Sequence, residues 1–512
     1  MLKNITQNPF FILDLANNHF GDQAHAKLII DKIAEVVADE EVQVAIKFQY
    51  RDLDTFIHPN FKNRRDIKYV DRFQSTELKP YQLLELADYV RTKGLGLITT
   101  PFDESSVLLA IEAKVDAIKI ASASCDDSRL LSAISKAGKP IIASTGGASI
   151  SEIDKLVSTL ESTSQDFAIM HCVAIYPSPN ETLNLRQINY FRDRYPNVPI
   201  GWSTHEDPDN LDAIKLAAAC GAQIFERHVG IETSKYPQNP YSSSPKQIAK
   251  WIKSYKLATQ MLGSYERMPA HEIEKTTLRS LKRAIFASNS LPAGHKIRES
   301  DLYYAIPSGE NQLLAGDTVL GRTLRTNLQA LSPISVSDLS ESNQSAENQV
   351  DSILYQIRGL LSESRTAINY DADFELSHHY GLHRFREFGV TLITCINREY
   401  AKKILVQLPR QKHPYHYHKI KEETFQLLWG DIEITVNGKK TILRPGDTCL
   451  VKPGEWHKFQ TLNGAVIEEI STTYKVSDSC YEDEKIASLD PAARKTKVQN
   501  WQPVFGFIKK LV

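Results

Sequence analysis

The chain has 512 residues, 42% of them apolar and 24% charged, and its 61 basic and 62 acidic residues give a formal charge of −1. This length exceeds what one hydrophobic core serves, so the sequence predicts several domains. The balanced charge argues against nucleic acid or a membrane surface as a partner, and no apolar run approaches the roughly 18 residues of a membrane-spanning helix. Scattered cysteines and the lack of a signal-peptide pattern predict a cytoplasmic protein.

Between residues 11 and 229, eight short apolar runs alternate with longer segments of helical periodicity. The runs are FILDL (11–15), VAIKFQ (44–49), GLITTP (96–101), AIKIA (117–121), IIAST (141–145), FAIMHC (167–172), PIGWST (199–204) and IFERHV (224–229). Continuous apolarity is typical of parallel strands buried on both faces, and the helical segments between the runs supply the crossovers. The sequence therefore predicts an α/β protein with a (β/α)8 TIM barrel over residues 1–272. A doubly wound open sheet is the alternative.

The rest of the chain has a different character. Residues 273–340 contain short β-like runs broken by Pro and Gly, which predict a small β-rich module. Residues 341–355 begin with a polar stretch without apolar periodicity and are interpreted as a linker. Residues 356–512 contain alternating segments separated by turn residues, which predict an all-β barrel or jelly roll whose apolar C-terminal tail is docked on the domain.

Polar side chains gather where the eight predicted strands end. They are Asp14, Asn18, His19, Lys47, Gln49, Thr100, Lys119, Ser122, Ser144, Thr145, His171, Ser203, His205, Glu226 and His228. In a TIM barrel the C-terminal ends of the strands form the rim on which active sites are built. The clustering therefore predicts one active site.

Two lysines, Lys47 and Lys119, lie within apolar strands, where a charge is costly to bury without an anionic partner. We expect both to face a ligand that carries phosphate or carboxylate groups. Nearby hydroxyl groups and the glycines at 146 and 147 are typical of a phosphate site. The alternative is that each lysine extends to solvent at a barrel end.

His205 and His228 follow the seventh and eighth predicted strands, which are neighbours in a barrel. Their imidazoles could converge on a divalent ion, with water or substrate completing the coordination. A histidine at a strand end is often a hydrogen-bonded structural residue, and this alternative stays open. Asp14 and the phosphate-type residues nearby favour a metal.

The motifs in this order resemble those of the sialic acid synthase family, which condenses phosphoenolpyruvate with an open-chain sugar. The matching stretches are DLANNHFGD, AIKFQ, TTPFD, IKIASAS, ASTGGAS, HCVAIYPSPNETLNL, GWSTHE and FERHVG. Residues 273–340 resemble the antifreeze-like (SAF) module that follows the barrel in this family. The resemblance implies a homodimer in which this module reaches over the partner's active site.

The family pattern implies roles for individual residues of the barrel. It places phosphoenolpyruvate on Lys47, Thr100, Phe102, Lys119, Ser122 and Ser203. It places a divalent ion, typically manganese, on His205 and His228, where the ion polarises the aldehyde oxygen of the acceptor sugar. Asp14 stands where the family has Glu, and its implied role is acid/base chemistry or the positioning of water.

Several positions depart from the family pattern where the family touches its sugar. Ser124 replaces a Glu, Ala174 an Asn, and Ile306 an Arg of the SAF module, while YPQNPYSSSP (236–245) replaces a loop that usually carries G-P-D-H. Ile cannot reproduce the hydrogen bonds of Arg. We therefore expect an acceptor other than plain N-acetylmannosamine.

The C-terminal domain carries two stretches that resemble the cupin motifs. HYHKIKEETFQLLWG and GDTCLVKPGEWH supply His416, His418, Glu423 and His457. Residues two apart on a strand face the same way, so these side chains can form a 3-His-1-carboxylate site for zinc, manganese, iron or nickel. A cupin that has lost its metal is the alternative.

These observations predict an enzyme of carbohydrate and surface-glycan biosynthesis. It would join phosphoenolpyruvate to a sugar aldehyde, giving a sialic acid-like 3-deoxy-2-ulosonic acid and phosphate. One alternative is a sugar-binding or regulatory protein with a decayed synthase site. Another is a bifunctional synthase whose cupin isomerises or epimerises the sugar.

Overall fold

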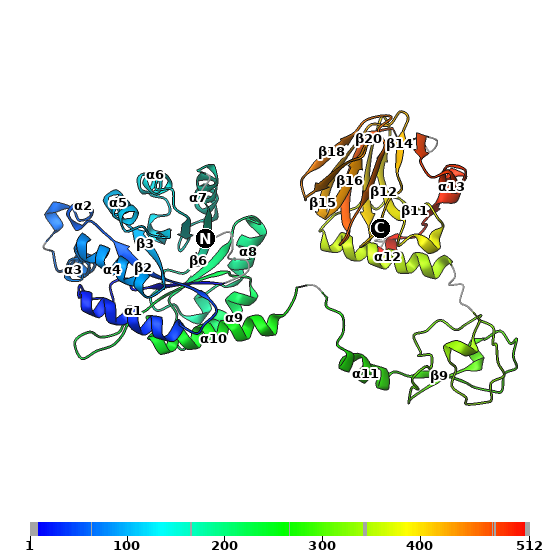
Figure 1. Cartoon of the computed structure of the whole chain (residues 1–512), viewed down its shortest axis with the longest axis horizontal. Coiled ribbons are helices and arrows are strands. Elements are labelled where there is room, and N and C mark those ends of the chain that lie inside the picture. The colour runs from blue at the N-terminus through cyan, green and yellow to red at the C-terminus, as the bar shows by residue number, and fades with distance from the viewer. Residues whose placement is uncertain are drawn as a thin grey trace, which may run out of the picture. The chain divides into compact units, whose positions relative to one another are not determined.

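The structure is a computed structural model that describes residues 9–62, 64–163, 166–265, 267–340, 346–473, 475 and 478–506. The chain divides into two units between Pro269 and Ala270, and each unit is described by itself. Figure 1 shows the elements of each unit.

The N-terminal unit contains a closed parallel barrel with the strand order β1 to β8. The strands are β1 (Phe10–Asp14), β2 (Gln43–Tyr50), β3 (Gly96–Pro101), β4 (Ala117–Ile120), β5 (Ile141–Ser144), β6 (Phe167–Cys172), β7 (Ile200–Thr204) and β8 (Ile224–His228). Each strand pairs in parallel with the next, and β8 pairs with β1. The predicted TIM barrel is confirmed, and the open-sheet alternative is wrong.

Helices lie between the barrel strands and cover their outer faces. They are α1 (Gln23–Val37), α2 (Leu53–Phe56), α3 (Lys68–Ser75), α4 (Pro80–Thr92), α5 (Glu104–Glu112), α6 (Ser128–Lys136), α7 (Ile150–Ser162), α8 (Arg186–Arg194), α9 (Asp212–Ala219) and α10 (Pro245–Leu262). Side-chain caps define several starts: Ser149 caps α7 and Ser244 caps α10, each in a capping box. These two caps fix the residues at which α7 and α10 begin.

The inside of the barrel is polar at the C-terminal ends of the strands and apolar in the part that precedes them. Its apolar floor consists of Phe10, Ile12, Ala45, Ile98, Ala117, Ile142, Ala168, Met170 and Ile224. Side chains alternate along a strand, so the next inward position after Ala45 is Lys47, after Ala117 is Lys119, and after Ile224 is Glu226. The polar side chains therefore lie at the C-terminal rim, on a packed support.

Residues 270–340 have their own small hydrophobic core. This part begins with α11 (Glu272–Leu281) and contains the antiparallel pair β9 (Ala284–Ala287) and β10 (Leu302–Ala305). Isolated β-bridges, such as the one between Leu291 and Leu328, connect the remaining loops of this part to one another. The predicted module boundary at 272/273 falls at the start of α11, so this helix belongs to the module rather than to the barrel.

Helix α12 (Ala346–Glu363) occupies most of the segment that was expected to be a linker over 341–355. The prediction of a linker is wrong from Ala346 onward. The reason is amphipathicity: Ile353, Leu354 and Ile357 repeat at helical spacing and are buried in the core beneath the C-terminal sheet.

The C-terminal domain consists of two antiparallel sheets, as predicted for a cupin. One has the order β18-β15-β20-β13-β12-β11-β22 and the other β17-β16-β19-β14-β21. Their strands are β11 (Asp373–His378), β12 (Gly389–Asn397), β13 (Tyr400–Gln407), β14 (His416–His418), β15 (Glu423–Gly430), β16 (Ile432–Val436), β17 (Lys439–Leu443), β18 (Thr448–Val451), β19 (His457–Gln460), β20 (Ala465–Thr472), β21 (Ser479–Tyr481) and β22 (Lys495–Lys497), with the short helix α13 (Glu484–Ala487). One core lies between the sheets, and a second lies between the larger sheet and α12. The tail is docked at Trp501, which is 3% exposed, while residues 507–512 lie outside the described residues.

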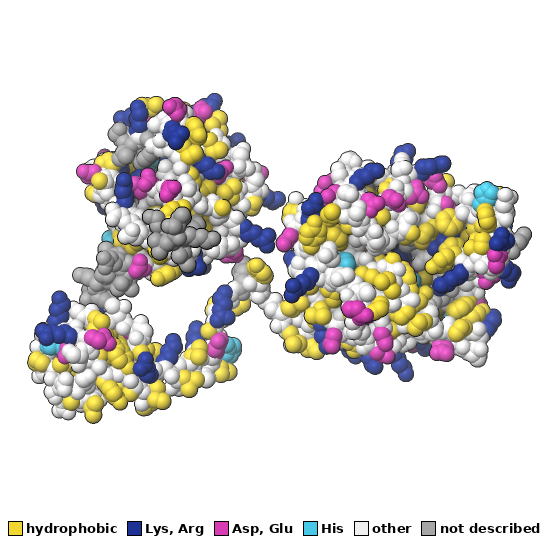
Figure 2. Space-filling model, turned by 180° about the vertical axis from the view of Figure 1, so that it is seen from behind, with side chains coloured by type: hydrophobic (Ala, Val, Ile, Leu, Met, Phe, Trp, Pro, Cys, Tyr) yellow, Lys and Arg dark blue, Asp and Glu magenta, His cyan; other side chains and the backbone are white. Residues whose placement is uncertain are grey.

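Basic and acidic side chains are interspersed over the face shown in Figure 2, with no extended area of one sign. This agrees with the balanced composition. Within the described ranges, no helix combines the length and apolarity needed to cross a membrane.

Candidate functional site

One carboxylate holds the two buried lysines of the barrel together. Glu226 Oε1 lies 3.2 Å from Lys47 Nζ, and Glu226 Oε2 lies 3.2 Å from Lys119 Nζ. Ser203 Oγ donates a hydrogen bond to Glu226 at 3.0 Å, and Lys119 donates one to Ser144 Oγ at 2.6 Å. Lys47 and Lys119 are only 4% and 2% exposed, so the alternative that they extend to solvent is wrong.

Asp14 joins this group from the end of β1. Its Cα is in register with Lys47 on one side and His228 on the other. Asp14 Oδ2 lies 3.0 Å from Lys47 Nζ and 3.5 Å from His228 Nε2, and it accepts a hydrogen bond from Gln49 at 3.0 Å. The carboxylate therefore lies between the lysine group and the histidine that was predicted to bind metal.

The charges of this group balance one another. Burial alone would raise the pKa of Glu226, but Lys119 and Lys47 hold it below its usual value. Burial would likewise raise the pKa of Asp14, but Lys47 and His228 lower it. Burial alone would lower the pKa of Lys47, but Asp14 and Glu226 raise it; burial of Lys119 does lower its pKa. With both carboxyls ionised, two positive and two negative charges cancel.

His205 and His228 lie side by side, with ring centroids 5.2 Å apart. Burial, and then the neighbouring His228, lowers the pKa of His205 to about 3, and burial lowers the pKa of His228. His205 Nδ1 bonds the carbonyl oxygen of Val173 at 3.1 Å, which leaves Nε2 with its lone pair. Neutral imidazoles with one nitrogen fixed by a backbone carbonyl fit a divalent ion. The pair supplies two ligands and leaves further coordination positions open.

Two tyrosines enclose the histidine pair and were missed by sequence reasoning. The Tyr176 ring lies 4.1 Å from that of His205, and the Tyr241 ring lies 5.5 Å from that of His228. Tyr241 belongs to the loop at 236–245 that departs from the family pattern. The departing loop therefore reaches the candidate metal ligands.

The other predicted phosphoenolpyruvate residues lie on the same rim. The Thr100 hydroxyl is buried and has no hydrogen-bond partner among the described residues, and Ser122 Oγ accepts a bond from Gly146 N at 2.9 Å. Phe102 packs on the Arg51 guanidinium, 3.7 Å from the ring centroid. Arg51 in turn donates to Gln49 at 2.9 Å, so it supports the residue that bonds Asp14.

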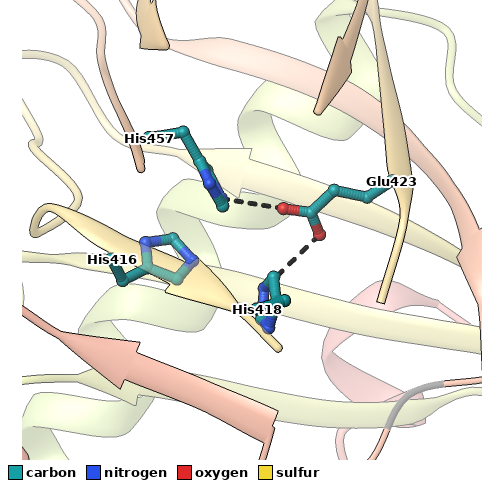
Figure 3. Close-up of side chains that lie close together, drawn as sticks. All are labelled: His416, His418, Glu423 and His457. Carbon is teal, nitrogen blue, oxygen red and sulfur yellow. Dashed lines mark ion pairs between the residues drawn. The ribbon is translucent and has the colours of Figure 1, made fainter. Parts of the chain in front are cut away.

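The cupin domain brings together the four predicted metal ligands, His416, His418, Glu423 and His457 (Figure 3). One potential ligand atom from each lies within 4.8 Å of the others. His457 Nε2 is 2.8 Å from Glu423 Oε1, and His418 Nε2 is 3.6 Å from Glu423 Oε2. All four side chains are buried. This arrangement could hold a metal ion.

Backbone carbonyl groups orient two of these imidazoles. His416 Nδ1 bonds the carbonyl oxygen of Pro414 and His457 Nδ1 that of Glu455, both at 3.1 Å. Burial lowers the pKa of His418 to about 4 and holds the pKa of His416 well below its usual value, so both are neutral at neutral pH. His416, a neutral imidazole whose Nδ1 is bonded to a backbone carbonyl, therefore presents Nε2 as a potential metal ligand. The four predicted ligands are therefore assembled in one place, as a metal site requires.

The architecture combines a (β/α)8 barrel with a charged rim site, a small module with its own core, and a cupin with a potential metal centre. Residues 29–267 match the model of the NeuB family, and residues 404–466 match that of the cupin domain. The chain belongs to the NeuB family and carries a cupin domain at its C-terminal end.

Proteins with known structures or assigned activities resemble part of the chain. The crystal structure of a Chromobacterium violaceum protein described as a spore coat polysaccharide biosynthesis protein E is 42% identical, covering 65% of this chain and all of that one, with a TM-score of 0.63. The N-acetylneuraminate-9-phosphate synthase of Mus musculus is 27% identical, covering 56% of this chain and 79% of its own length. The N,N'-diacetyllegionaminic acid synthase of Legionella pneumophila is 26% identical, covering 63% and 92%.

Glu226 is the main site residue to which sequence reasoning assigned no role. A signal was present, because Glu226 stands two residues before His228 and so faces the barrel interior. Only the closed barrel shows that it meets both Lys47 and Lys119.

Proposed function

We propose that the barrel is a phosphoenolpyruvate-dependent synthase that joins phosphoenolpyruvate to an open-chain sugar aldehyde, giving a nonulosonic-type 3-deoxy-2-ulosonic acid and phosphate. The observation that carries this proposal is the pair Lys47 and Lys119, buried side by side above an apolar floor and next to His205 and His228. Synthases of N-acetylneuraminate 9-phosphate and of N,N'-diacetyllegionaminic acid among the relatives support it.

The chain's own residues would share the work of the reaction. Lys47, Lys119 and Ser203 bind the phosphate and carboxylate groups of phosphoenolpyruvate, with Thr100, Phe102 and Ser122 on the same rim. Asp14, ionised and held by Gln49, positions or deprotonates the water that adds to C2 before phosphate leaves. The apolar floor keeps bulk water away from these charges.

His205 and His228 would hold a divalent ion, for which we propose manganese. The ion would polarise the aldehyde oxygen and add positive charge to a site whose own charges cancel. Phosphoenolpyruvate is strongly anionic, whereas the lysines and carboxylates of the site carry no net charge. A divalent ion would therefore supply positive charge that the binding of this anion needs.

The acceptor is proposed to differ from plain N-acetylmannosamine. The side chain of Ile306, which is 63% exposed, offers no hydrogen bond from the module, and Tyr241 brings an aromatic ring to the histidine pair.

A homodimer with an exchanged SAF module belongs to the same proposal. Sedimentation of the full chain measures the mass of the particle in solution and so tests the dimer.

The test is phosphate release from phosphoenolpyruvate with manganese across a panel of aldoses and amino sugars. We expect release with at least one acceptor, and the product mass gives the carbon count and substituents of that acceptor. Lys119→Met should lower release at least 100-fold. If phosphoenolpyruvate binds but no acceptor gives phosphate, the sugar-binding or regulatory alternative replaces the synthase.

A further inference from the structure

The cupin domain contains a small, partly open pocket of about 60 Å³ next to its four potential metal ligands. One side of the pocket is apolar, with Leu405, Phe425 and Phe459 among its lining residues. The lining also includes charged residues that are not among the four potential metal ligands, and Lys403, Lys421 and Glu469 are three of them. A pocket in which a few polar groups converge beside apolar side chains is typical of a small-molecule site.

Glu469 is held in place through one of its two oxygens. Its Oε1 accepts hydrogen bonds from Lys403 Nζ at 3.2 Å, Lys421 Nζ at 3.1 Å and Ser471 Oγ at 3.1 Å. These three bonds, made within the described part of the domain, all end on Oε1 and leave Oε2 for a molecule in the pocket. Glu469 is 3% exposed and its side chain lines the pocket.

Lys421 connects Glu469 to the potential metal centre. Its ammonium group contacts the Glu423 carboxylate as well as that of Glu469. Glu469 is not one of the four potential metal ligands. The ammonium group of Lys421 nevertheless bridges its carboxylate to that of the potential ligand Glu423. Both side chains enter from strands of the larger sheet, β15 and β20, which pair with one another.

A purely structural role does not account for this arrangement. Two lysines and a glutamate buried in a sheet core lose their hydration, and apolar residues of similar volume are often at least as stabilising there. On the opposite face of the same strand, Glu468 forms an ordinary ion pair with Lys402 at 2.6 Å. The buried charges are instead gathered where the pocket meets the metal ligands.

We propose that the cupin domain is a second active site that interconverts an aldose and a ketose, with Glu469 as the base. The substrate class is an open-chain sugar with a carbonyl group next to a carbinol carbon, whose oxygens face the His416, His418, Glu423 and His457 cluster. A metal held there makes the carbon-bound proton beside the carbonyl more acidic.

The proton transfer balances without any added reagent. Glu469 Oε2 takes the proton from C2, and the C–H electron pair forms the C1–C2 double bond of an enediol. The C2 hydroxyl proton moves toward the C1 oxygen, with the Lys421 ammonium beside the developing charge. Glu469 then returns its proton to C1, which converts the aldose into the ketose. The reverse sequence gives the aldose.

This activity fits the needs of the barrel. A synthase that attacks an aldehyde requires an aldose, and an isomerase in the same chain can supply it from a ketose. This link, unlike the cupin reaction itself, rests on the proposed synthase function.

The experiment uses the full metal-loaded chain in ²H₂O with a panel of pentoses and hexoses that carry a hydroxyl group at C2. Proton NMR follows the loss of the C2 proton of each sugar. We expect exchange with at least one sugar. We expect Glu469→Gln to lower the exchange rate at least 100-fold, while its metal content by elemental analysis matches that of the wild type. Glu468→Gln, on the opposite face, is the matched control and should exchange at the wild-type rate.

Further measurements keep the outcomes distinct. Glu469→Asp preserves the charge balance in case Glu469→Gln does not fold, and its exchange should fall at least 10-fold. Titration calorimetry with xylitol and glucitol, which cannot react, should show binding by the wild type and by Glu469→Asp. Lys119→Met should lose phosphate release and keep exchange, which separates this proposal from the synthase.

Two results would overturn the proposal. One is a wild-type protein that holds its metal and exchanges no sugar of the panel. The other is a folded Glu469→Gln protein that exchanges as fast as the wild type.

Discussion

At the scale of single residues, the carboxylate of Glu226 and a bound anion would compete for the same two ammonium groups. Lys47 and Lys119 each lie 3.2 Å from Glu226, and no water layer separates them. A ligand phosphate that binds these lysines must share them with Glu226. The ligand-free site is therefore stabilised by the same charges that the substrate would use.

Removing this carboxylate should make the fold depend on an added anion. Glu226→Gln leaves two buried lysines short of negative charge, and we expect it to lower the free energy of unfolding by about 3 kcal/mol or more. Inorganic phosphate should recover part of this loss and should raise the unfolding midpoint more in the variant than in the wild type. Thermal unfolding with and without phosphate measures both effects.

The matched control is Glu206→Gln. Glu206 forms an equally buried ion pair with Arg227 at 2.7 Å, away from the lysine group. Its loss should also destabilise the protein, but phosphate should not restore it. Equal phosphate shifts in the Glu226 variant and the wild type would contradict the interpretation of the lysine pair as an anion site.

Buried neutral histidine should make the cupin sensitive to acid. Burial, followed by the nearby Arg494, lowers the pKa of His379 to about 3 from 6.5. Below pH 6.5 the unfolded chain takes up a proton that the folded chain refuses until about pH 3. Stability is therefore complete above pH 6.5 and falls as the pH drops through this window, by about 2 kcal/mol at pH 5.

The measurement is urea unfolding of the cupin domain at pH 7 and pH 5. His379→Gln should reduce the difference between the two free energies of unfolding by about 2 kcal/mol, because Gln does not titrate. His383→Gln, at an exposed position of the same domain, should leave the difference unchanged. An unchanged difference in the His379 variant would show that His379 takes up its proton in the folded state.

At the scale of elements, continuous apolar runs predicted the eight barrel strands to within about one residue at each end. Parallel strands buried on both faces must be apolar throughout, so their signal is strong. Helix α12 was missed because its first turns are polar, and its apolar stripe, with Ile353 and Ile357, became meaningful only beneath a sheet. Lys421 and Glu469 were missed because they are 48 residues apart and meet only across paired strands.

The barrel floor should tolerate no added atom at Gly201 in β7. A Cβ there would lie 2.8 Å from the carbonyl oxygen of Ile224 and 2.9 Å from its Cβ, on a neighbouring strand that is fixed by pairing. We expect Gly201→Ala to lower the free energy of unfolding by about 1–3 kcal/mol. Chemical denaturation measures this change.

The same substitution at Gly359, inside α12, meets open space. Gly359→Ala should therefore stabilise the protein by about 0.5–1 kcal/mol, because alanine loses less conformational freedom in a helix. A Gly201 variant that unfolds at the wild-type denaturant concentration would mean that β7 and β8 can separate without loss of barrel stability.

At the scale of the whole molecule, the two units have separate hydrophobic cores. The barrel core lies on both sides of its strands, and the cupin core lies between its sheets and beneath α12. The sequence predicted both folds and both ligand sets from local motifs. It gave no measure of how stability is distributed between the units, because that depends on which side chains share a core.

Separate cores predict separate unfolding transitions with different ligand responses. A metal bound by His416, His418, Glu423 and His457 stabilises only the folded cupin, and at 100 times its dissociation constant it contributes about 2.7 kcal/mol. Phosphate bound near Lys47 and Lys119 stabilises only the folded barrel. In scanning calorimetry we therefore expect one transition that rises with phosphate. We expect another that falls by roughly 5–10 °C when a chelator removes the metal.

The control is His457→Gln, which removes one potential metal ligand. The cupin transition of this variant should lie near the temperature that the wild type shows with chelator, and chelator should not move it further. The barrel transition should keep its response to phosphate. One transition that moves with both additions would instead show that the barrel and the cupin unfold together, and a metal bound in the cupin would then stabilise the barrel as well.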